Sequence, residues 1–254
     1  MCLIAFAIDC HPLYRLVLAA NRDEYRRRPT VPAGFWTDAP HVLAGRDHQA
    51  GGTWIGVTTA GKFAAVTNYR DARQQVADPP SRGLLVADYL RDPCMTTSEL
   101  RQHLLQNADR YDGFNLLYGT VTDIHYFTNR GGSSGAVQPG IHGLSNHLLD
   151  TDWPKSVVAR ERLTQILRQP EPSAAELIKA MADQTSYEDS MLPETGIGLD
   201  RERFLSPIFI NGDTYGTRST TVILARHNGT IEFIEQGYDT PHSPVQQFSI
   251  RINP

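Results

Sequence analysis

The sequence predicts an α+β fold in which strands occupy both ends of the chain and helices lie between them. Apolar, strand-like runs are found at residues 3–8 and 14–20 and again from residue 208 onwards, whereas segments with helical periodicity lie between residues 78 and 184. This order differs from the alternating strand and helix units of a parallel sheet, and no repeat, low-complexity tract or linker interrupts it. We therefore expect one layered domain over residues 1–254.

The composition is that of an ordinary globular protein, with 40% hydrophobic and 20% charged residues. A net charge of −4 argues against a general nucleic-acid or anionic-membrane binder. No apolar run approaches the roughly 20 residues that span a bilayer, and the N-terminus lacks the basic residues of a signal peptide. Cys2, Cys10 and Cys94 show neither metal-ligand nor disulfide spacing, which favours a cytoplasmic location and predicts no metal and no cofactor.

The first strand begins beside a cysteine. Removal of Met1 is compatible with the small side chain of Cys2, and it would leave that residue with a thiol and a free α-amine. A thiol of pKa about 8.5 beside an amine of pKa about 7.7–8.0 provides a nucleophile and a base on one residue. A small second residue is also common in proteins without such chemistry, so the rest of the chain must decide.

A turn at residues 9–12 joins the first strand to the second. The second strand is followed by four polar residues, 21–24. Antiparallel pairing would return the chain to the Cys2 end, which predicts that Arg22 and Asp23 flank the thiol. Four polar residues after an apolar strand are also typical of a hydrated turn.

The segment that follows contains two further candidate positions. A Pro-rich connection is expected at residues 29–40, and the glycines before Trp54 allow close backbone approach. Trp54 is either a core anchor or a pocket wall. A strand at residues 63–67 ends at Asn68, whose amide can donate to a developing oxyanion or cap a turn.

The remaining elements follow from periodicity and turn signals. Ser81 and Ser173 are plausible helix N-caps, residues 187–201 are expected to form a loop that covers a pocket, and Asn228-Gly229 is a hairpin turn. The predicted helices are 78–91, 98–110, 155–169 and 173–184, and the predicted later strands are 114–120, 123–128, 208–211, 219–225, 230–236 and 246–252.

Four segments together resemble the NRDE family, which includes the eukaryotic transport-and-Golgi-organisation proteins. They are Cys2 at the start, residues 21–24 (Asn-Arg-Asp-Glu), residues 51–54 and residues 215–219. The NRDE pattern is in turn similar to the cysteine branch of the N-terminal nucleophile hydrolases, which contains bile-salt hydrolases and penicillin V acylases. That resemblance implies a four-layer αββα sandwich of two antiparallel sheets between helical layers.

The resemblance also implies roles for individual residues. The group usually separates its Arg and Asp by two residues, whereas Arg22 and Asp23 are adjacent, so Asn21 or Glu24 is an alternative for one role. Cations beside the nucleophile would lower the pKa of its thiol. The implied catalytic residues are Cys2 as nucleophile, Arg22, Asp23 and Arg218 around it, and Asn68 and Asn146 as oxyanion donors; the candidate substrate-binding residues are Asn21, Trp54 and Tyr69.

The leading hypothesis is hydrolysis of an amide or thioester of a small, lipid-like substrate through an acyl-enzyme on Cys2. The alternative is a non-catalytic carrier for a hydrophobic ligand, a lipid or haem, on the same scaffold, because a fold does not establish catalysis. Retention of Met1 would favour the carrier, since the nitrogen of Cys2 would then be an amide. The oligomeric state is left open.

Overall fold

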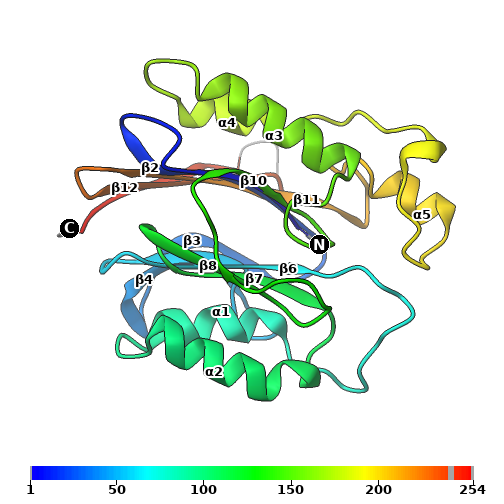
Figure 1. Ribbon diagram of the computed structural model, residues 1–254, viewed down its shortest axis with the longest axis horizontal. Coiled ribbons are helices and arrows are strands. Elements are labelled where there is room, and N and C mark those ends of the chain that lie inside the picture. Colours follow the sequence, from blue (N-terminus) through cyan, green and yellow to red (C-terminus); the bar gives the residue numbers. More distant parts are fainter. Residues whose placement is uncertain (1, 240–242, 253–254) are drawn as a thin grey trace.

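The computed structural model describes residues 2–239 and 243–252, which form four layers (Figure 1). Two antiparallel sheets face each other in the middle, and a pair of helices covers the outer face of each. The predicted α+β class and αββα sandwich are confirmed. The helices are α3 (Pro154–Ile166) and α4 (Ala174–Ala180) on the first sheet, and α1 (Arg82–Arg91) and α2 (Thr97–Asn107) on the second.

The first sheet carries the N-terminal hairpin, and its order is β10-β1-β2-β11-β12-β13. Strand β2 continues through residues 21–24, so these four polar residues are part of a central strand between β1 and β11 and not a hydrated turn. The strands are β1 (Cys2–Ile8), β2 (Tyr14–Tyr25), β10 (Gly140–Leu144), β11 (Tyr215–Arg226), β12 (Thr230–Gly237) and β13 (Val245–Arg251).

The second sheet follows chain order from β3 to β9. The expected connection at residues 29–40 is wrong, because most of it forms β3 and the start of β4. Pro32 lies on β3, the edge strand, at a register shift between Val31 and Gly34, where its missing N–H is tolerated. The strands are β3 (Thr30–Trp36), β4 (Ala39–Asp47), β5 (Ile55–Thr58), β6 (Lys62–Asn68), β7 (Phe114–Thr120), β8 (Asp123–Thr128) and β9 (Gly135–Ala136).

The apolar run of β1 is buried on both faces. Ile4, Phe6 and Ile8 pack in the core between the two sheets, whereas Leu3 and Ala5 pack against the layer of α3 and α4. Successive strand residues point to opposite faces, so a strand with a helix layer on one side and a sheet on the other is apolar throughout. This burial fixes the register that positions Cys2.

All four predicted helices are shorter than predicted, and α3 ends at Ile166 and not at residue 169. Helix α1 begins at Arg82 and not at residue 78, because Asp78 has a positive φ of 47° and two prolines follow it. Helix α2 is continued by a short 3-10 turn, η1 (Ala108–Arg110). Helix α4 has Ser173 at its N-cap, as predicted, although it ends at Ala180.

Two predictions for the region before β11 are corrected. Residues 187–201 contain a 3-10 turn, η2 (Asp189–Met191), and the start of α5 (Leu199–Phe204), which lies at the same end of the sandwich as the N-terminus (Figure 1). Residues 208–211 are not a strand. Ile208 and Ile210 are buried, but the contact with β11 is confined to Thr217, whose hydroxyl accepts from the Ile210 amide and whose amide donates to the Ile210 carbonyl, and no strand pairing extends from it.

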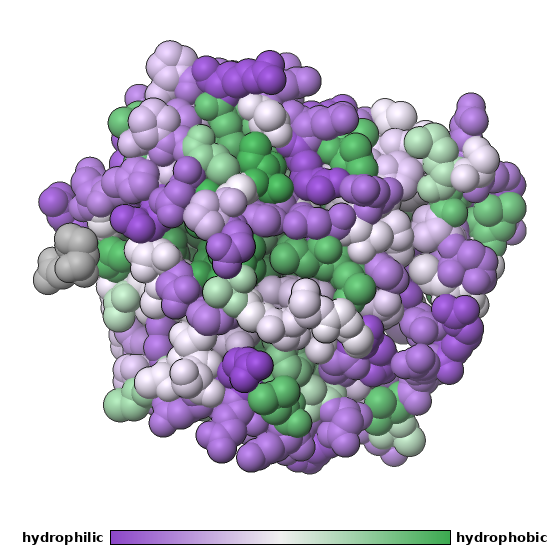
Figure 2. Space-filling view, viewed as in Figure 1, coloured by the Kyte–Doolittle hydropathy of each residue, from purple (hydrophilic) through white to green (hydrophobic). Residues whose placement is uncertain are grey.

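Hydrophilic side chains dominate the face in Figure 2, and apolar side chains show mainly in a band across its middle. In the part of the chain that the structure describes, no helix is both long enough and apolar enough to span a bilayer.

Candidate active site

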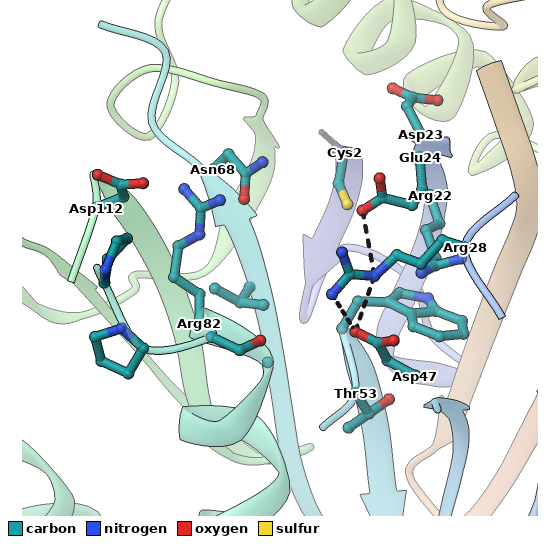
Figure 3. A pocket seen from close by; sticks show the side chains of 16 residues that line it. Cys2, Arg22, Asp23, Glu24, Arg28, Asp47, Thr53, Asn68, Arg82 and Asp112 are labelled. Carbon is teal, nitrogen blue, oxygen red and sulfur yellow. Dashed lines mark hydrogen bonds and ion pairs between the residues drawn. The ribbon is translucent and has the colours of Figure 1, made fainter. Parts of the chain in front are cut away.

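Cys2 lies in the wall of a cavity of about 310 Å³ that both sheets line (Figure 3). One wall consists of the ends of β1 and β2, and the other includes Asn68 at the end of β6 and Arg82 at the start of α1. Trp54 also lines the cavity and is therefore a pocket wall. Charged residues make up much of the lining: Arg22, Asp23, Glu24, Arg28, Asp47, Arg82 and Asp112.

Arg22 lies beside the nucleophile, as the hairpin predicts, because it is the antiparallel partner of Cys2. Its guanidinium stacks over the Trp54 ring at 4.2 Å and donates to the Thr30 hydroxyl at 3.2 Å. A cation held in this buried position can stabilise a thiolate on the neighbouring strand.

Asp23 points to the opposite face of β2 from Arg22, since successive strand residues alternate. It is only 1% exposed, and its Oδ1 accepts a hydrogen bond from the Thr217 hydroxyl at 2.7 Å. The Tyr215 hydroxyl donates to its backbone carbonyl at 2.9 Å. Burial raises the pKa of Asp23, and the positive charge of Lys155 is the main opposing influence.

The pKa of the Cys2 thiol differs from the low value expected from the sequence. Burial raises the pKa of Cys2; Asp23 raises it further, and Arg22 lowers it. The expected low pKa is therefore wrong for the chain with Met1 attached, because the thiol is desolvated. Met1 lies outside the described residues, so its removal stays a prediction.

The two candidate oxyanion donors have different positions. Asn68 lines the cavity across from Cys2 (Figure 3). Asn146 is fully buried and does not line it: its amide Nδ2 donates to the Asn68 carbonyl at 3.0 Å, and its Oδ1 accepts from Arg70 at 3.2 Å. Asn146 therefore fixes the backbone that carries Asn68.

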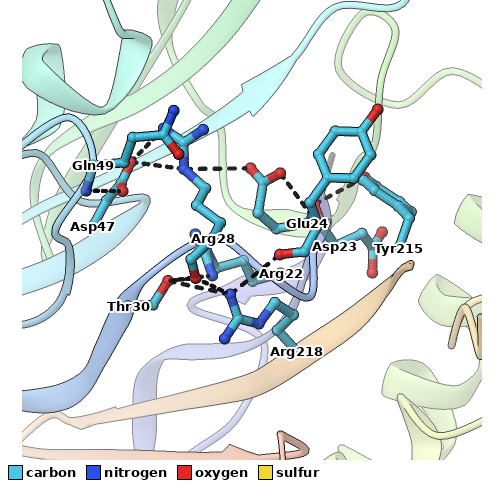
Figure 4. A network of polar contacts seen from close by, with 10 residues as sticks. Arg22, Asp23, Glu24, Arg28, Thr30, Asp47, Gln49, Tyr215 and Arg218 are labelled. Carbon is cyan, nitrogen blue, oxygen red and sulfur yellow. Dashed lines mark hydrogen bonds and ion pairs between the residues drawn. The ribbon is translucent and has the colours of Figure 1, made fainter. Parts of the chain in front are cut away.

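Arg218 is not brought into the Cys2 cavity. It occupies a register shift of β11 between Thr217 and Ser219, and it binds Asp239 through two nitrogens, one at 2.8 Å. Its Nη1 donates to the carbonyl of Arg28 in the turn after β2 (Figure 4). Arg218 thus secures the turn that follows the polar segment of β2.

Two candidate substrate-binding residues are also placed elsewhere. Asn21 is 1% exposed, and its Nδ2 donates to the carbonyls of Met181 and Ile208, both at 2.8 Å. Tyr69 packs against His147, with ring centroids 4.9 Å apart, outside the cavity. Asn21 is a core residue, and the alternation that buries it is also what points Arg22 to the thiol.

The structure adds residues that the sequence alone did not single out. Arg82 and the Arg28–Asp47 ion pair (2.6 Å) line the cavity. Lys155 is buried on the Asp23 side, where burial lowers its pKa to about 8 and its Nζ donates to the Leu205 carbonyl at 3.0 Å. In the sequence, only its position directly after Pro154 at the start of a predicted helix distinguishes Lys155 from other lysines.

A second buried charge pair lies on the same side of the first sheet. Arg70 and Glu202 form an ion pair of 2.5 Å, and the Arg70 guanidinium lies over Trp153. The amide and hydroxyl of Thr195 donate to Glu202, so residues 187–201 pack here and do not cover the Cys2 cavity. Among residues 2–239 and 243–252, no group of three His, Cys, Asp or Glu side chains is arranged to hold a metal.

Comparisons with known proteins agree with this architecture. A family model described as Transport and Golgi organisation 2 matches residues 1–240. The Transport and Golgi organization 2 homolog of Mus musculus is 35% identical over 257 residues, which cover 93% of this chain and 92% of the mouse protein. The Drosophila melanogaster Transport and Golgi organization protein 2 is 27% identical with the same coverage.

Among solved structures, the mutant C2A conjugated bile acid hydrolase from Clostridium perfringens matches with a TM-score of 0.53. The match covers 99% of this chain and 92% of that chain at 10% sequence identity. At this identity the likeness concerns the fold alone.

Proposed function

We propose that this chain, which belongs to the Transport and Golgi organisation 2 family, hydrolyses an amide or a thioester through an acyl-enzyme on Cys2. The observation that carries the proposal is the placement of Cys2 in a cavity between its strand partner Arg22 and, on the opposite wall, Asn68. A nucleophile, a cation beside it and an amide donor across from it are what acyl transfer requires.

The base in this proposal is the α-amine that removal of Met1 would expose. Cys2 pairs with Arg22, so Asp23 lies one step further along β2, on the side of the Cys2 nitrogen. A carboxylate in this position would hold the ammonium form and orient the amine. Of the adjacent pair, Arg22 can therefore act on the thiol and Asp23 on the amine.

The reaction then proceeds in two balanced steps. The amine takes the thiol proton, Sγ attacks the carbonyl carbon, and the Asn68 amide donates to the oxyanion; the C–N or C–S bond breaks as the leaving group receives the proton. Water next attacks the acyl thioester with the amine as base, which releases a carboxylic acid and regenerates the thiol. Asn146 holds Asn68 in place and touches no reacting atom in this scheme.

The lining favours a small polar substrate in place of the lipid-like one that the resemblance suggested. The charged groups around Cys2 would lose hydration to an apolar chain without compensation. The same observation counts against a carrier for lipid or haem at this cavity. The cysteine content is the reason why we propose a cytoplasmic location.

The test uses a Cys10→Ala/Cys94→Ala double variant, so that any adduct on a cysteine must be on Cys2. Intact mass spectrometry is expected to show loss of Met1 and then an acyl adduct after mixing with S-butyryl-N-acetylcysteamine, absent when Cys2→Ala is added. An N-terminally tagged form, in which the Cys2 nitrogen is an amide, should react with iodoacetamide more slowly than the processed form. Equal rates would exclude the α-amine as the base. The absence of both an adduct and Cys2-dependent release of free thiol from the thioester would count against the hydrolase.

A further inference from the structure

We infer that Arg82 determines the specificity of the Cys2 site by binding a carboxylate carried by the substrate. The inference rests on the proposed function for the identity of the site, but the presence of an anion subsite can be measured without turnover.

Arg82 reaches into the cavity from the first residue of α1, and its guanidinium lies beside Asn68 (Figure 3). One nitrogen, Nη1, donates to the Gly113 carbonyl at 2.9 Å. Within the described part of the chain, no carboxylate oxygen comes within the 4.0 Å ion-pair distance of Arg82. Asp112, which also lines the cavity, accepts the backbone N–H of Val76 at 3.0 Å.

The other two arginines of the cavity are already engaged. Arg28 binds Asp47 through two nitrogens, at 2.6 and 3.0 Å. Arg22 is stacked on Trp54 and bonded to Thr30. Arg22 and Arg82 are therefore the cavity-lining arginines without an ion pair among the residues that the structure describes. Arg22 lies beside the thiol as the strand partner of Cys2, which leaves Arg82 as the cation for a charged group of the substrate.

A second guanidinium increases the attraction for an anion. Arg130 lies on the other side of Gly113, where a Cβ would come within 3.1 Å of the Arg130 Nε. It donates to the carbonyls of Asn129 and Gln74, both at 3.3 Å, and has no ion pair with a described residue. Burial lowers the pKa of Arg82; Asp112, Cys2 and Glu24 oppose this shift, and the Arg130 charge lowers the pKa further. An incoming anion would relieve both costs.

A carboxylate fits this subsite better than a phosphate. The planar guanidinium presents parallel N–H donors that match the two oxygens of a carboxylate. The acidic residues Glu24, Asp47 and Asp112 share the cavity and would repel a dianion more strongly than a monoanion. A cavity of about 310 Å³ lies at the lower end of the range for small-molecule sites, so the carboxylate and the scissile bond belong to one small molecule.

The kinetic test compares three thioesters of matched size: neutral S-butyryl-N-acetylcysteamine, S-succinyl-N-acetylcysteamine, and the butyryl thioester of 3-mercaptopropionate. At least one carboxylate-bearing thioester should exceed the neutral one in kcat/KM by about 10- to 100-fold, the range for a charged hydrogen-bonded pair. Arg82→Gln should abolish that preference, so that the carboxylate-bearing thioesters have no higher kcat/KM than the neutral thioester in the same variant. Arg101→Ala, at an exposed position of α2, is the control and should retain it.

A binding test covers the case in which no thioester is turned over. Succinamate, a monoanion, should raise the melting temperature of the wild type and of Arg101→Ala, whereas it should not raise that of Arg82→Gln, and neutral succinamide should affect none of them. Arg82→Lys, which keeps the charge without the planar fork, should respond weakly and controls for a folding defect in Arg82→Gln.

The outcomes separate the two proposals. Acylation of Cys2 without a carboxylate preference and without succinamate stabilisation overturns the role of Arg82 and leaves the hydrolase standing. Succinamate stabilisation that depends on Arg82, without any acylation, supports the anion subsite and counts against the hydrolase. Equal losses for all three thioesters in Arg82→Gln would show a structural role only and overturn the inference.

Discussion

At the scale of single residues, the alternation of β2 lets two neighbours act on different groups. Arg22 faces the cavity with Cys2, whereas Asp23 faces the side where Thr217 and Lys155 lie. A pair separated by two residues would also point to opposite faces, but its members would lie about 10 Å apart along the strand. Adjacent placement keeps both residues beside Cys2.

Asn68 is the residue whose replacement should separate chemistry from stability. Its side-chain amide has no hydrogen-bond partner among the described residues, and it lines the cavity. Asn68→Ala should therefore lower the rate of Cys2 acylation by about 10²–10³-fold, as loss of an oxyanion donor does elsewhere. The free energy of unfolding, measured in urea, should change little.

Asn146→Ala is the matched comparison, because it removes the same amide from a buried position. The Asn68 carbonyl and the Arg70 guanidinium would each lose a partner. We expect a loss of about 1–3 kcal/mol in the free energy of unfolding. If Asn68→Ala destabilised the protein as much as Asn146→Ala, its amide would be structural and not an oxyanion donor.

The residue-scale predictions from sequence succeeded where local strand geometry was sufficient. Antiparallel pairing after a short turn brings Arg22 to Cys2 without knowledge of the rest of the chain. Asn21 could not be placed in this way, because its partners are carbonyls 160 and 187 residues away. Whether a polar strand residue meets a ligand or the core depends on such distant segments, and the same holds for Arg218 and Asp239.

At the scale of elements, the loop before β5 and the start of α1 cross at two glycines. A Cβ on Gly52 would lie 2.4 Å from the carbonyl carbon of Gly83, and the amide of Thr53 donates to the Gly83 carbonyl at 3.1 Å. Both contacts are with backbone, which cannot move aside as a flexible side chain can. This crossing sets where Arg82 and Trp54 enter the cavity.

Gly52→Ala should therefore disturb both stability and the site. Because the added methyl meets backbone atoms, the loop or α1 must shift, and we expect a loss of about 1–3 kcal/mol in the free energy of unfolding. Trp54 fluorescence should change in the folded state, since the indole packs at this loop. Gly34→Ala, on β3, is the control because no atom lies within 4 Å of its added Cβ; a similar loss in both variants would contradict the crossing.

Element boundaries were predictable where an explicit signal exists. Ser173 caps α4 as its position suggests, and the glycines at 51–52 mark a close approach. The sequence misled at β3, where prolines indicate a connection but an edge strand accommodates Pro32 at a register shift. It also misled at residues 208–211, where the Ile210 carbonyl accepts a bond from the Thr217 amide of β11 but no ladder forms, because β11 pairs with β2 and β12 instead.

At the scale of the whole molecule, charges are buried between the first sheet and its covering segments as well as in the cavity. Asp23, Lys155, Arg70 and Glu202 interact over this region, with the direct ion pair between Arg70 and Glu202. Buried groups of opposite sign offset part of each other's desolvation cost but seldom all of it. For Lys155, part of the desolvation cost is not offset: burial lowers its pKa from 10.5 to about 8 even though Asp23 and Glu202 oppose the shift.

This residual cost predicts how stability depends on pH. Lys155 is 3% exposed, and its pKa is about 8 in the folded protein against 10.5 for an ordinary lysine. Between these values the unfolded chain holds a proton that the folded chain has released, so the Lys155 contribution to the free energy of unfolding rises with pH across this window. Below pH 8 both states are charged and the cost is constant. The difference of 10.5 − 8 = 2.5 corresponds to about 3 kcal/mol.

Urea unfolding of the wild type and Lys155→Met from pH 7 to pH 10.5 measures this contribution, because other titrating groups largely cancel between the two proteins. The wild type should gain about 2–3 kcal/mol relative to the variant over this range. Lys179→Met, at an exposed position of α4, controls for the loss of one positive charge. Stability curves for the wild type and Lys155→Met that stay parallel would show that Lys155 keeps its ordinary pKa, and hence that solvent or a stronger ion pair than the fold shows supports the charge beside Asp23.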